Sequence, residues 1–207
     1  MQNWVSYQNG NYTVKLNTEN GTKIRENDLD FFDAEFPESA DVKVTNRCSN
    51  GCPFCHEGST KDGKHSDALH SPVWESFHPY TEVALGGGNL MEYPDFVPLL
   101  ERLKTLKLIP NITIHQWDFE KNFDLIKKLS DEKLIYGLGV SLDKVTPDFI
   151  DKMKQFPNGV IHVINGIVTG VQLRALAHNG LKILILGYKN VRRGSKLYHS
   201  NVGYAID

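Results

Sequence analysis

Six short apolar segments, separated by helical patterns, constrain the fold of this chain more than any other feature. Each segment is rich in β-branched residues and apolar on both sides, as parallel strands covered by helices must be. The segments cover residues 41–46, 81–86, 111–116, 135–142, 159–165 and 181–188. Their alternation with helical patterns predicts a parallel α/β domain.

The segments between these strands carry helical signals. Helical patterns cover residues 95–108, 123–133, 146–156 and 168–180. Pro94 stands just before the first pattern as a start signal. Thr146 and Pro147 suit an N-cap and a first helical position, and Thr169 is a cap candidate for the last helix. Gly180 marks the end of that helix.

Two architectures fit this alternation, an open doubly wound sheet and a barrel, whole or partial. In both, functional residues lie at the carboxyl ends of the strands. Unusual residues cluster at those ends. They are a cysteine-bearing loop after the first strand, Gly86–Asn89 after the second, His115–Trp117 at the third, Ser141 and Asp143 at the fourth, Asn165 at the fifth and Tyr188–Lys189 at the sixth.

The chain divides into three parts. Residues 12–17 and 22–25 are short strand-like runs joined by the turn-forming Glu19-Asn20-Gly21, which predicts a β-hairpin. We therefore expect a hairpin and an acidic connector over residues 1–40, a core domain over 41–194 and a C-terminal tail over 195–207. A length of 207 residues suits one sizeable core.

Composition narrows the class of protein. Hydrophobic residues make up 40% of the chain and charged residues 23%, close to globular averages. No window approaches the ~18 apolar residues that a membrane-spanning helix needs. The N-terminus lacks a signal-peptide pattern, so we expect a cytoplasmic protein without a membrane partner. A net charge of −2 gives no general attraction to nucleic acid.

All three cysteines, Cys48, Cys52 and Cys55, fall within the stretch RCSNGCPFCHEGST. An odd count without a secretion signal disfavours disulfides and favours metal or redox chemistry. Thiolates select zinc, copper(I) or iron-sulfur clusters. A structural zinc ion would need His56 or His65 as its fourth ligand, since there is no second cysteine pair. A cubane cluster held by three cysteines would leave one iron open to a ligand.

The cysteines have the spacing C-x3-C-x2-C, and Phe54 stands just before the last of them. This motif follows the first strand of a six-unit α/β chain. In these features the sequence resembles the radical S-adenosylmethionine (radical SAM) superfamily. This resemblance implies a partial (β/α)6 TIM-like barrel. It also implies that Cys48, Cys52 and Cys55 bind a 4Fe-4S cluster, whose open iron is chelated by the amino and carboxylate groups of S-adenosylmethionine.

Other positions extend the resemblance. The stretch LGGGNLMEYPDF is similar to the family's glycine-rich motif, which implies that Gly87, Gly88 and Asn89 cradle the methionine end of the cofactor. Asn89 stands where glutamate is commoner. By position, the resemblance also implies cofactor contacts from Phe54, Ser141, Asn165 and Lys189. The N-terminal hairpin, CHEGSTKDGKH and LGYKNVRRG together resemble a small group of phage and prophage-type radical SAM proteins.

The implied activity is an oxidoreductase-type reaction. A reduced cluster cleaves S-adenosylmethionine, and the resulting 5'-deoxyadenosyl radical takes a hydrogen atom from a substrate. That substrate is a small molecule, nucleotide, peptide or protein, and an external one-electron reductant is needed. Alternatives are a glycyl-radical activase and a non-catalytic, zinc-stabilised α/β binding module. The basic residues near the C-terminus fit either a solvated loop or a phosphate site. These are Lys189, Arg192, Arg193 and Lys196.

Overall fold

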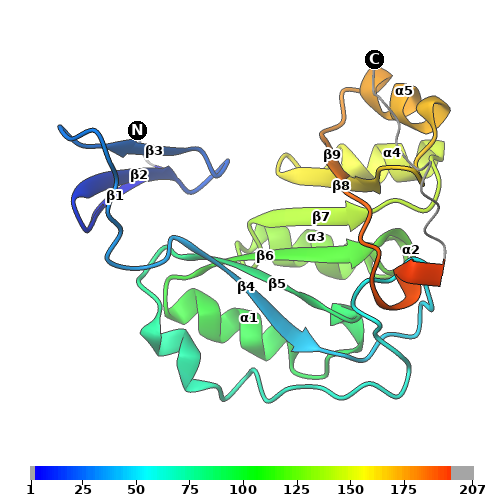
Figure 1. The fold of residues 1–207 in the computed structure, drawn as a ribbon, viewed down its shortest axis with the longest axis horizontal. Coiled ribbons are helices and arrows are strands. Elements are labelled where there is room, and N and C mark those ends of the chain that lie inside the picture. The colour runs from blue at the N-terminus through cyan, green and yellow to red at the C-terminus, as the bar shows by residue number, and fades with distance from the viewer. Residues whose placement is uncertain (1–2, 197–207) are drawn as a thin grey trace.

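The computed structural model describes residues 3–196 of the chain. Most of the predicted C-terminal tail, from residue 197 onward, lies outside the described residues. The architecture consists of a large parallel sheet with helices and a small antiparallel sheet formed by the N-terminal residues (Figure 1).

Six parallel strands form the large sheet, and all six strand predictions are confirmed. The strands are β4 (Ser39–Thr45), β5 (Glu82–Gly87), β6 (Ile109–His115), β7 (Gly137–Ser141), β8 (Gly159–Ile164) and β9 (Ile183–Leu186). Their order in the sheet is their order in the sequence. The register places apolar side chains of neighbouring strands side by side. For example, Leu85 of β5 pairs with Val42 of β4 and with Ile112 of β6.

The four predicted helices are also present, together with elements that were not predicted. The α-helices are α1 (Phe96–Thr105), α2 (Gln116–Lys121), α3 (Phe123–Asp131), α4 (Pro147–Met153) and α5 (Gly170–His178). Short 3-10 helices are η1 (Pro72–Ser76), η2 (Leu90–Glu92) and η3 (Arg192–Lys196). Thr146 caps α4 as expected, and Thr169 forms a capping box with Gln172. Helix α2 was missed.

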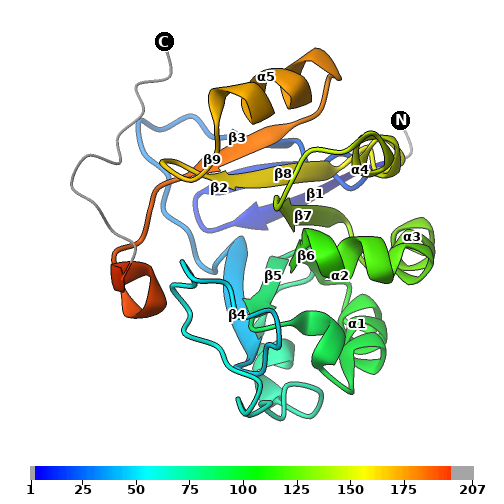
Figure 2. The same ribbon diagram turned by 90° about the vertical axis from the view of Figure 1, so that its right-hand side faces the viewer.

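The sequential strand order disagrees with a doubly wound sheet. A doubly wound sheet reverses its strand order and carries helices on both faces. Here each right-handed crossover leads to the next strand on the same side, which places the helices on one face. Figures 1 and 2 show α1, α3 and α4 along that face of the curved sheet. Within residues 3–196 the β4–β5 connection carries only η1, so the first unit departs from a strict (β/α)6 repeat.

The two faces of the sheet differ in chemistry. Side chains alternate between the faces along each strand. On β6, Ile112 and Ile114 are buried under the helices, whereas Thr113 and His115 face the opposite side. Leu99, Leu100 and Leu103 of α1 and Ile126 and Leu129 of α3 complete the core on the helical side. The other face of the sheet borders a cavity.

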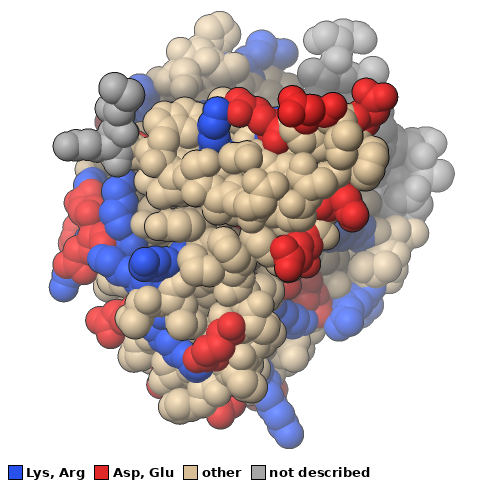
Figure 3. Space-filling model, turned by 90° about the vertical axis from the view of Figure 1, so that its left-hand side faces the viewer, with Lys and Arg blue, Asp and Glu red and all other residues tan. Residues whose placement is uncertain are grey.

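The N-terminal residues form a three-stranded antiparallel sheet. Its strands are β1 (Trp4–Asn9), β2 (Tyr12–Asn17) and β3 (Lys23–Glu26), in the order β1-β2-β3. The predicted β2–β3 hairpin is confirmed, and β1 was not predicted. This sheet lies at the amino ends of the parallel strands (Figure 1). Its outward side presents a largely uncharged surface with charged residues toward the margins (Figure 3).

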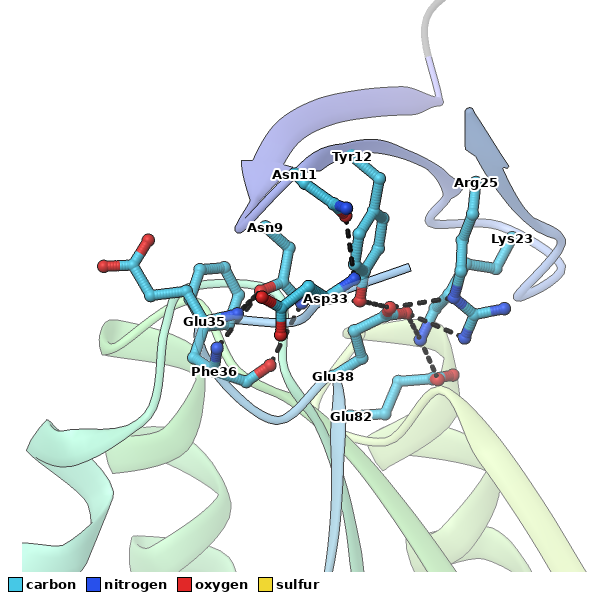
Figure 4. Close-up of polar contacts among 10 residues, drawn as sticks. All are labelled: Asn9, Asn11, Tyr12, Lys23, Arg25, Asp33, Glu35, Phe36, Glu38 and Glu82. Atoms are coloured by element: carbon cyan, nitrogen blue, oxygen red, sulfur yellow. Dashed lines mark hydrogen bonds and ion pairs between the residues drawn. The ribbon is translucent and has the colours of Figure 1, made fainter. Parts of the chain in front are cut away.

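Glu38 connects the small sheet to the large one (Figure 4). Its carboxylate accepts hydrogen bonds from Arg25 (Nε–Oε1, 2.8 Å) and from the Tyr12 hydroxyl (2.7 Å), both on the small sheet. Lys23 bridges Glu38 (3.2 Å) and Glu82 of β5 (2.9 Å). Burial opposes ionisation of Glu38, but the hydrogen bonds from Arg25, Tyr12 and Lys23 outweigh it and lower its pKa to about 2.

Asparagines fix the connector between the two sheets. Oδ1 of Asn9 accepts the backbone N–H groups of Glu35 (2.9 Å) and Phe36 (3.1 Å). Oδ1 of Asn11 accepts the N–H of Asp33 (2.8 Å). These bonds satisfy backbone groups of an irregular segment that has no strand partner. The connector therefore has a defined path into β4.

Candidate functional site

A cavity of about 450 Å³ opens at the carboxyl ends of the parallel strands. Residues from or just after all six strands line it, including all three cysteines. Of the predicted cofactor contacts, Phe54, Gly87, Gly88, Asn89, Ser141 and Lys189 line this cavity. Asn165 is not among the lining residues. A second cavity of about 310 Å³ lies between the N-terminal sheet and the amino ends of the strands, and no cysteine lines it.

The cysteine loop is anchored by backbone hydrogen bonds. The N–H of Cys48 donates to the carbonyl of Thr60 (2.9 Å), and the N–H of Thr60 donates to Asn46 (3.2 Å). The N–H of Cys55 donates to the carbonyl of Cys52 (3.2 Å). Gly51 has a φ of +65°, which permits the turn between the first two cysteines. The loop is therefore held at both ends while its thiols border the cavity.

The three thiols are reduced, partly exposed and close enough to affect one another. Burial raises the pKa of the Cys52 thiol, and the charges of Cys48 and Cys55 raise it further. Among residues 3–196, no three histidine, cysteine or carboxylate side chains gather as ligands of one metal ion. A cubane cluster does not need three ligands around one ion, because each of its cysteines binds a separate iron atom. Three soft thiols on one loop, beside one cavity, suit such a cluster.

The two histidines considered as zinc ligands have other partners. Nδ1 of His65 lies 2.9 Å from the Thr45 hydroxyl, where the two residues form an isolated β-bridge. His56 lines the cavity and lies 3.3 Å from Glu57. Burial lowers the pKa of His56, and the neighbouring charge of Lys189 lowers it further.

Glu92 joins the cysteine loop to the glycine-rich segment. Its carboxylate accepts from the backbone N–H of Ser49 (2.8 Å) and from the Ser49 hydroxyl (3.1 Å). It also forms an ion pair with Arg47 (3.2 Å). The residues on both sides of Cys48 are thus tied to η2.

Asn89 has a different set of contacts from the one expected. Its Oδ1 accepts the N–H of Met91 (3.0 Å) and so caps η2, although the resemblance implies that Asn89 contacts the methionine end of the cofactor. Its Nδ2 donates to Asp118 (2.8 Å) and to Glu92 (3.2 Å). Asn89 is only 7% exposed. A direct contact between Asn89 and a cofactor stays a prediction.

The glycine-rich turn packs tightly on the end of β4. A Cβ on Gly87 would lie 2.4 Å from the carbonyl oxygen of Thr45, and one on Gly88 would lie 2.0 Å from that of Arg47. Gly88 donates its N–H to Thr45 (2.7 Å). Both glycines are therefore required by contact with backbone, whereas a Cβ on Gly86 would meet no atom within 4 Å.

The segment after β9 folds back onto the cysteine loop. Arg193 donates from Nε to the carbonyl of Cys52 (3.0 Å) and from Nη1 to that of Ser59 (2.7 Å). Arg192 donates to the carbonyl of Glu57 (2.9 Å). These two arginines therefore contact the loop directly, although Arg192 is also exposed to solvent, as the solvated-loop alternative expects. Lys189 lines the cavity.

Some residues at the end of β6 stabilise the local structure, and others line the cavity. His115 caps α2 through Nδ1, which accepts the N–H of Trp117 (3.2 Å), and burial lowers its pKa. Gln116 is buried and accepts the backbone N–H groups of Asp143 and Lys144. The Trp117 indole donates to Asp143 (3.0 Å). His115 and Asp143 line the cavity, and so does Asp118, which the sequence analysis missed.

No protein-family model matches this sequence, and no curated protein is similar to it. Among solved structures the fold is similar to SuiB of Streptococcus suis. SuiB bound to the precursor peptide SuiA and SuiB bound to S-adenosylmethionine each match with a TM-score of 0.62 and 16% identity, over 92% of this chain and 63% of SuiB. A third SuiB structure matches with a TM-score of 0.58 and 15% identity, over 99% of this chain and 64% of SuiB.

At this identity the likeness to SuiB establishes the fold. The chain spans less than two thirds of the length of SuiB. Among the described residues, no helix has the length and apolar character needed to cross a membrane.

Proposed function

We propose that this chain is a radical S-adenosylmethionine enzyme built on a partial (β/α)6 barrel. Cys48, Cys52 and Cys55 would hold a 4Fe-4S cluster at the mouth of the cavity. The observation that carries the proposal is the position of all three thiols on one cavity at the carboxyl ends of the strands. The similarity of the fold to SuiB, which has been solved with S-adenosylmethionine bound, supports it.

A bound cluster and S-adenosylmethionine would supply a 5'-deoxyadenosyl radical, and the protein would orient the reactants and exclude water. The cavity has the size of a small-molecule site. Its walls combine apolar residues such as Leu142 and Ile164 with a few polar groups, among them Ser141 and His162. The apolar walls can bury a ligand, and the polar groups can orient it.

Of the substrate classes expected from the sequence, we propose a peptide. Support comes from SuiB, which has been solved with a precursor peptide bound. The proposal also requires an external one-electron reductant. We also propose a cytoplasmic location, because an oxygen-sensitive cluster suits a reducing compartment.

The test is the low-temperature electron paramagnetic resonance spectrum of protein reconstituted anaerobically with iron and sulfide and reduced with dithionite. We expect a 4Fe-4S signal that changes when S-adenosylmethionine is added, because the cofactor binds the open iron. The triple variant Cys48→Ala, Cys52→Ala, Cys55→Ala is the control and should give no cluster signal. A protein that takes up zinc instead of a cluster would support the zinc-stabilised binding module and contradict the proposal.

The same preparation separates the two enzyme options. A radical enzyme acting on a free substrate should form 5'-deoxyadenosine faster when a substrate peptide is present. A glycyl-radical activase should instead produce an organic radical signal on a partner protein. The measurement therefore distinguishes direct modification from activation of a partner.

A further inference from the structure

Asp118 occupies a defined place at the edge of the cavity. It lies in the first turn of α2, which begins directly after β6 because His115 ends the strand and caps the helix. Asp118 lines the same cavity as the three cysteines. Its carboxylate is fixed from two sides. Asn50, in the cysteine loop, donates to Oδ2 (2.6 Å), and Asn89, after β5, donates to Oδ1 (2.8 Å).

The charge of Asp118 has no cationic partner among residues 3–196. Both of its side-chain partners are neutral amides, and no lysine, arginine or histidine in that range lies within ion-pair distance. Glu57, another carboxylate on the cavity, pairs with Lys43 at 2.5 Å. A carboxylate offers about four acceptor positions, so Asp118 keeps capacity for a further donor.

The position of this carboxylate matches one group of the proposed cofactor. The methionine end of S-adenosylmethionine carries an α-ammonium group, which would lie beside the cysteine loop. A cation donating to a carboxylate forms a short, charge-assisted hydrogen bond, stronger than one to a neutral amide oxygen. The neighbouring Asn89 presents its N–H2 to Asp118 and uses its oxygen on Met91, so it orients the carboxylate.

We propose that Asp118 binds the α-ammonium group of S-adenosylmethionine, with Asn50 and Asn89 holding its carboxylate in place. The inference rests on the proposed function, because it assumes that this cofactor occupies the cavity. It assigns the ammonium contact to helix α2 instead of the glycine-rich segment.

The experiment compares two ligands on cluster-loaded protein by anaerobic equilibrium dialysis. S-adenosylmethionine carries the ammonium group, and 5'-methylthioadenosine lacks the whole amino-acid end. The variant Asp118→Asn should weaken the binding of S-adenosylmethionine by about 10- to 100-fold, which corresponds to the loss of one hydrogen bond to a charged group. The affinity for methylthioadenosine should not change. Asp118→Glu keeps the charge and should recover part of the loss. The control Asp124→Asn, at an exposed carboxylate in the first turn of α3 and outside the cavity, should change neither affinity.

The quantity to compare is the ratio of the two affinities, which does not depend on the fraction of protein that is active. An Asp118→Asn ratio equal to that of the wild type, in protein that loads a cluster, would overturn the inference. If Asp118→Asn does not load a cluster, Asp118→Glu decides, since a ratio more than about 100-fold below the wild type would also overturn it. Wild-type protein that binds neither cluster nor S-adenosylmethionine would instead refute the proposed function.

Discussion

Replacing Arg193 by alanine tests whether the C-terminal segment holds the cysteine loop in place. Arg193 donates one hydrogen bond to Cys52 and one to Ser59, at 3.0 and 2.7 Å. Hydrogen bonds from a charged donor contribute about 1.5–3 kcal/mol each when buried. Because Arg193 is only partly buried and the two bonds share one side chain, we expect a combined loss of about 2 kcal/mol. That corresponds to a roughly 30-fold larger population of the open loop.

Hydrogen exchange of the metal-free protein, followed by mass spectrometry, measures this opening. The amides of Cys48 and Thr60 are bonded across the loop, so they report on it. In Arg193→Ala they should exchange about 30-fold faster, whereas amides of β7 should not change. Arg192→Ala is the matched control, since Arg192 donates one bond to the loop and should cause a smaller increase. Unchanged exchange in the loop, or equal acceleration in β7, would refute the reasoning.

Four other predictions concern stability and binding. Glu38→Gln should lower the free energy of unfolding by about 1–2 kcal/mol at pH 7, after allowance for the exposure of Arg25. Because the pKa of Glu38 is lowered from 4.5 to about 2 on folding, its contribution is complete above pH 4.5 and is lost as the pH falls through about 2. Urea unfolding at pH 7 and pH 2.5 checks this, and an equal difference at both values would contradict it. Gly88→Ala should cost about 3 kcal/mol by thermal unfolding, because its Cβ would lie 2.0 Å from a backbone oxygen. A Cβ on Gly86 would lie in open space, so Gly86→Ala should leave the free energy of unfolding unchanged but weaken the binding of S-adenosylmethionine. An unchanged affinity would show that the ligand lies elsewhere. Cys52→Ala should abolish cluster binding, as measured by iron content.

Local signals explain which elements could be predicted from the sequence. The six parallel strands are compact β-branched runs, and the Thr146 and Thr169 caps depend only on residues within one turn. Strand β1 was missed, although Val5 and Tyr7 alternate with Ser6 and Gln8 as in a half-buried strand. Helix α2 was missed because six residues give too short a period to recognise. Strand order is a long-range property, so sequence patterns left two architectures open.

In the candidate site, too, features with a local sequence signal could be predicted, and features that depend on long-range contacts could not. The cysteines lie within a span of eight residues, so their spacing was visible in the sequence. Asp118 lies 68 residues from Asn50, and no local pattern relates the two side chains. The aspartate follows the predicted end of β6 by only a few residues, which is the one signal that could have found it. The glycine-rich segment was recognised, but its tight contact with the backbone of Thr45 and Arg47 could not be anticipated.

The hydrogen bond between Arg193 and Cys52 joins residues 141 positions apart. A ribosome therefore makes the cysteines long before it makes the arginine that holds their loop. During synthesis the loop has its contacts to β4 and η2 first, those to α2 next and those to η3 last. Whatever the thiols bind, their final arrangement has to wait until the sixth strand has joined the sheet. Loading of the site is thus expected to follow folding of the chain, and a nascent chain should present three thiols on a loop that η3 does not yet hold.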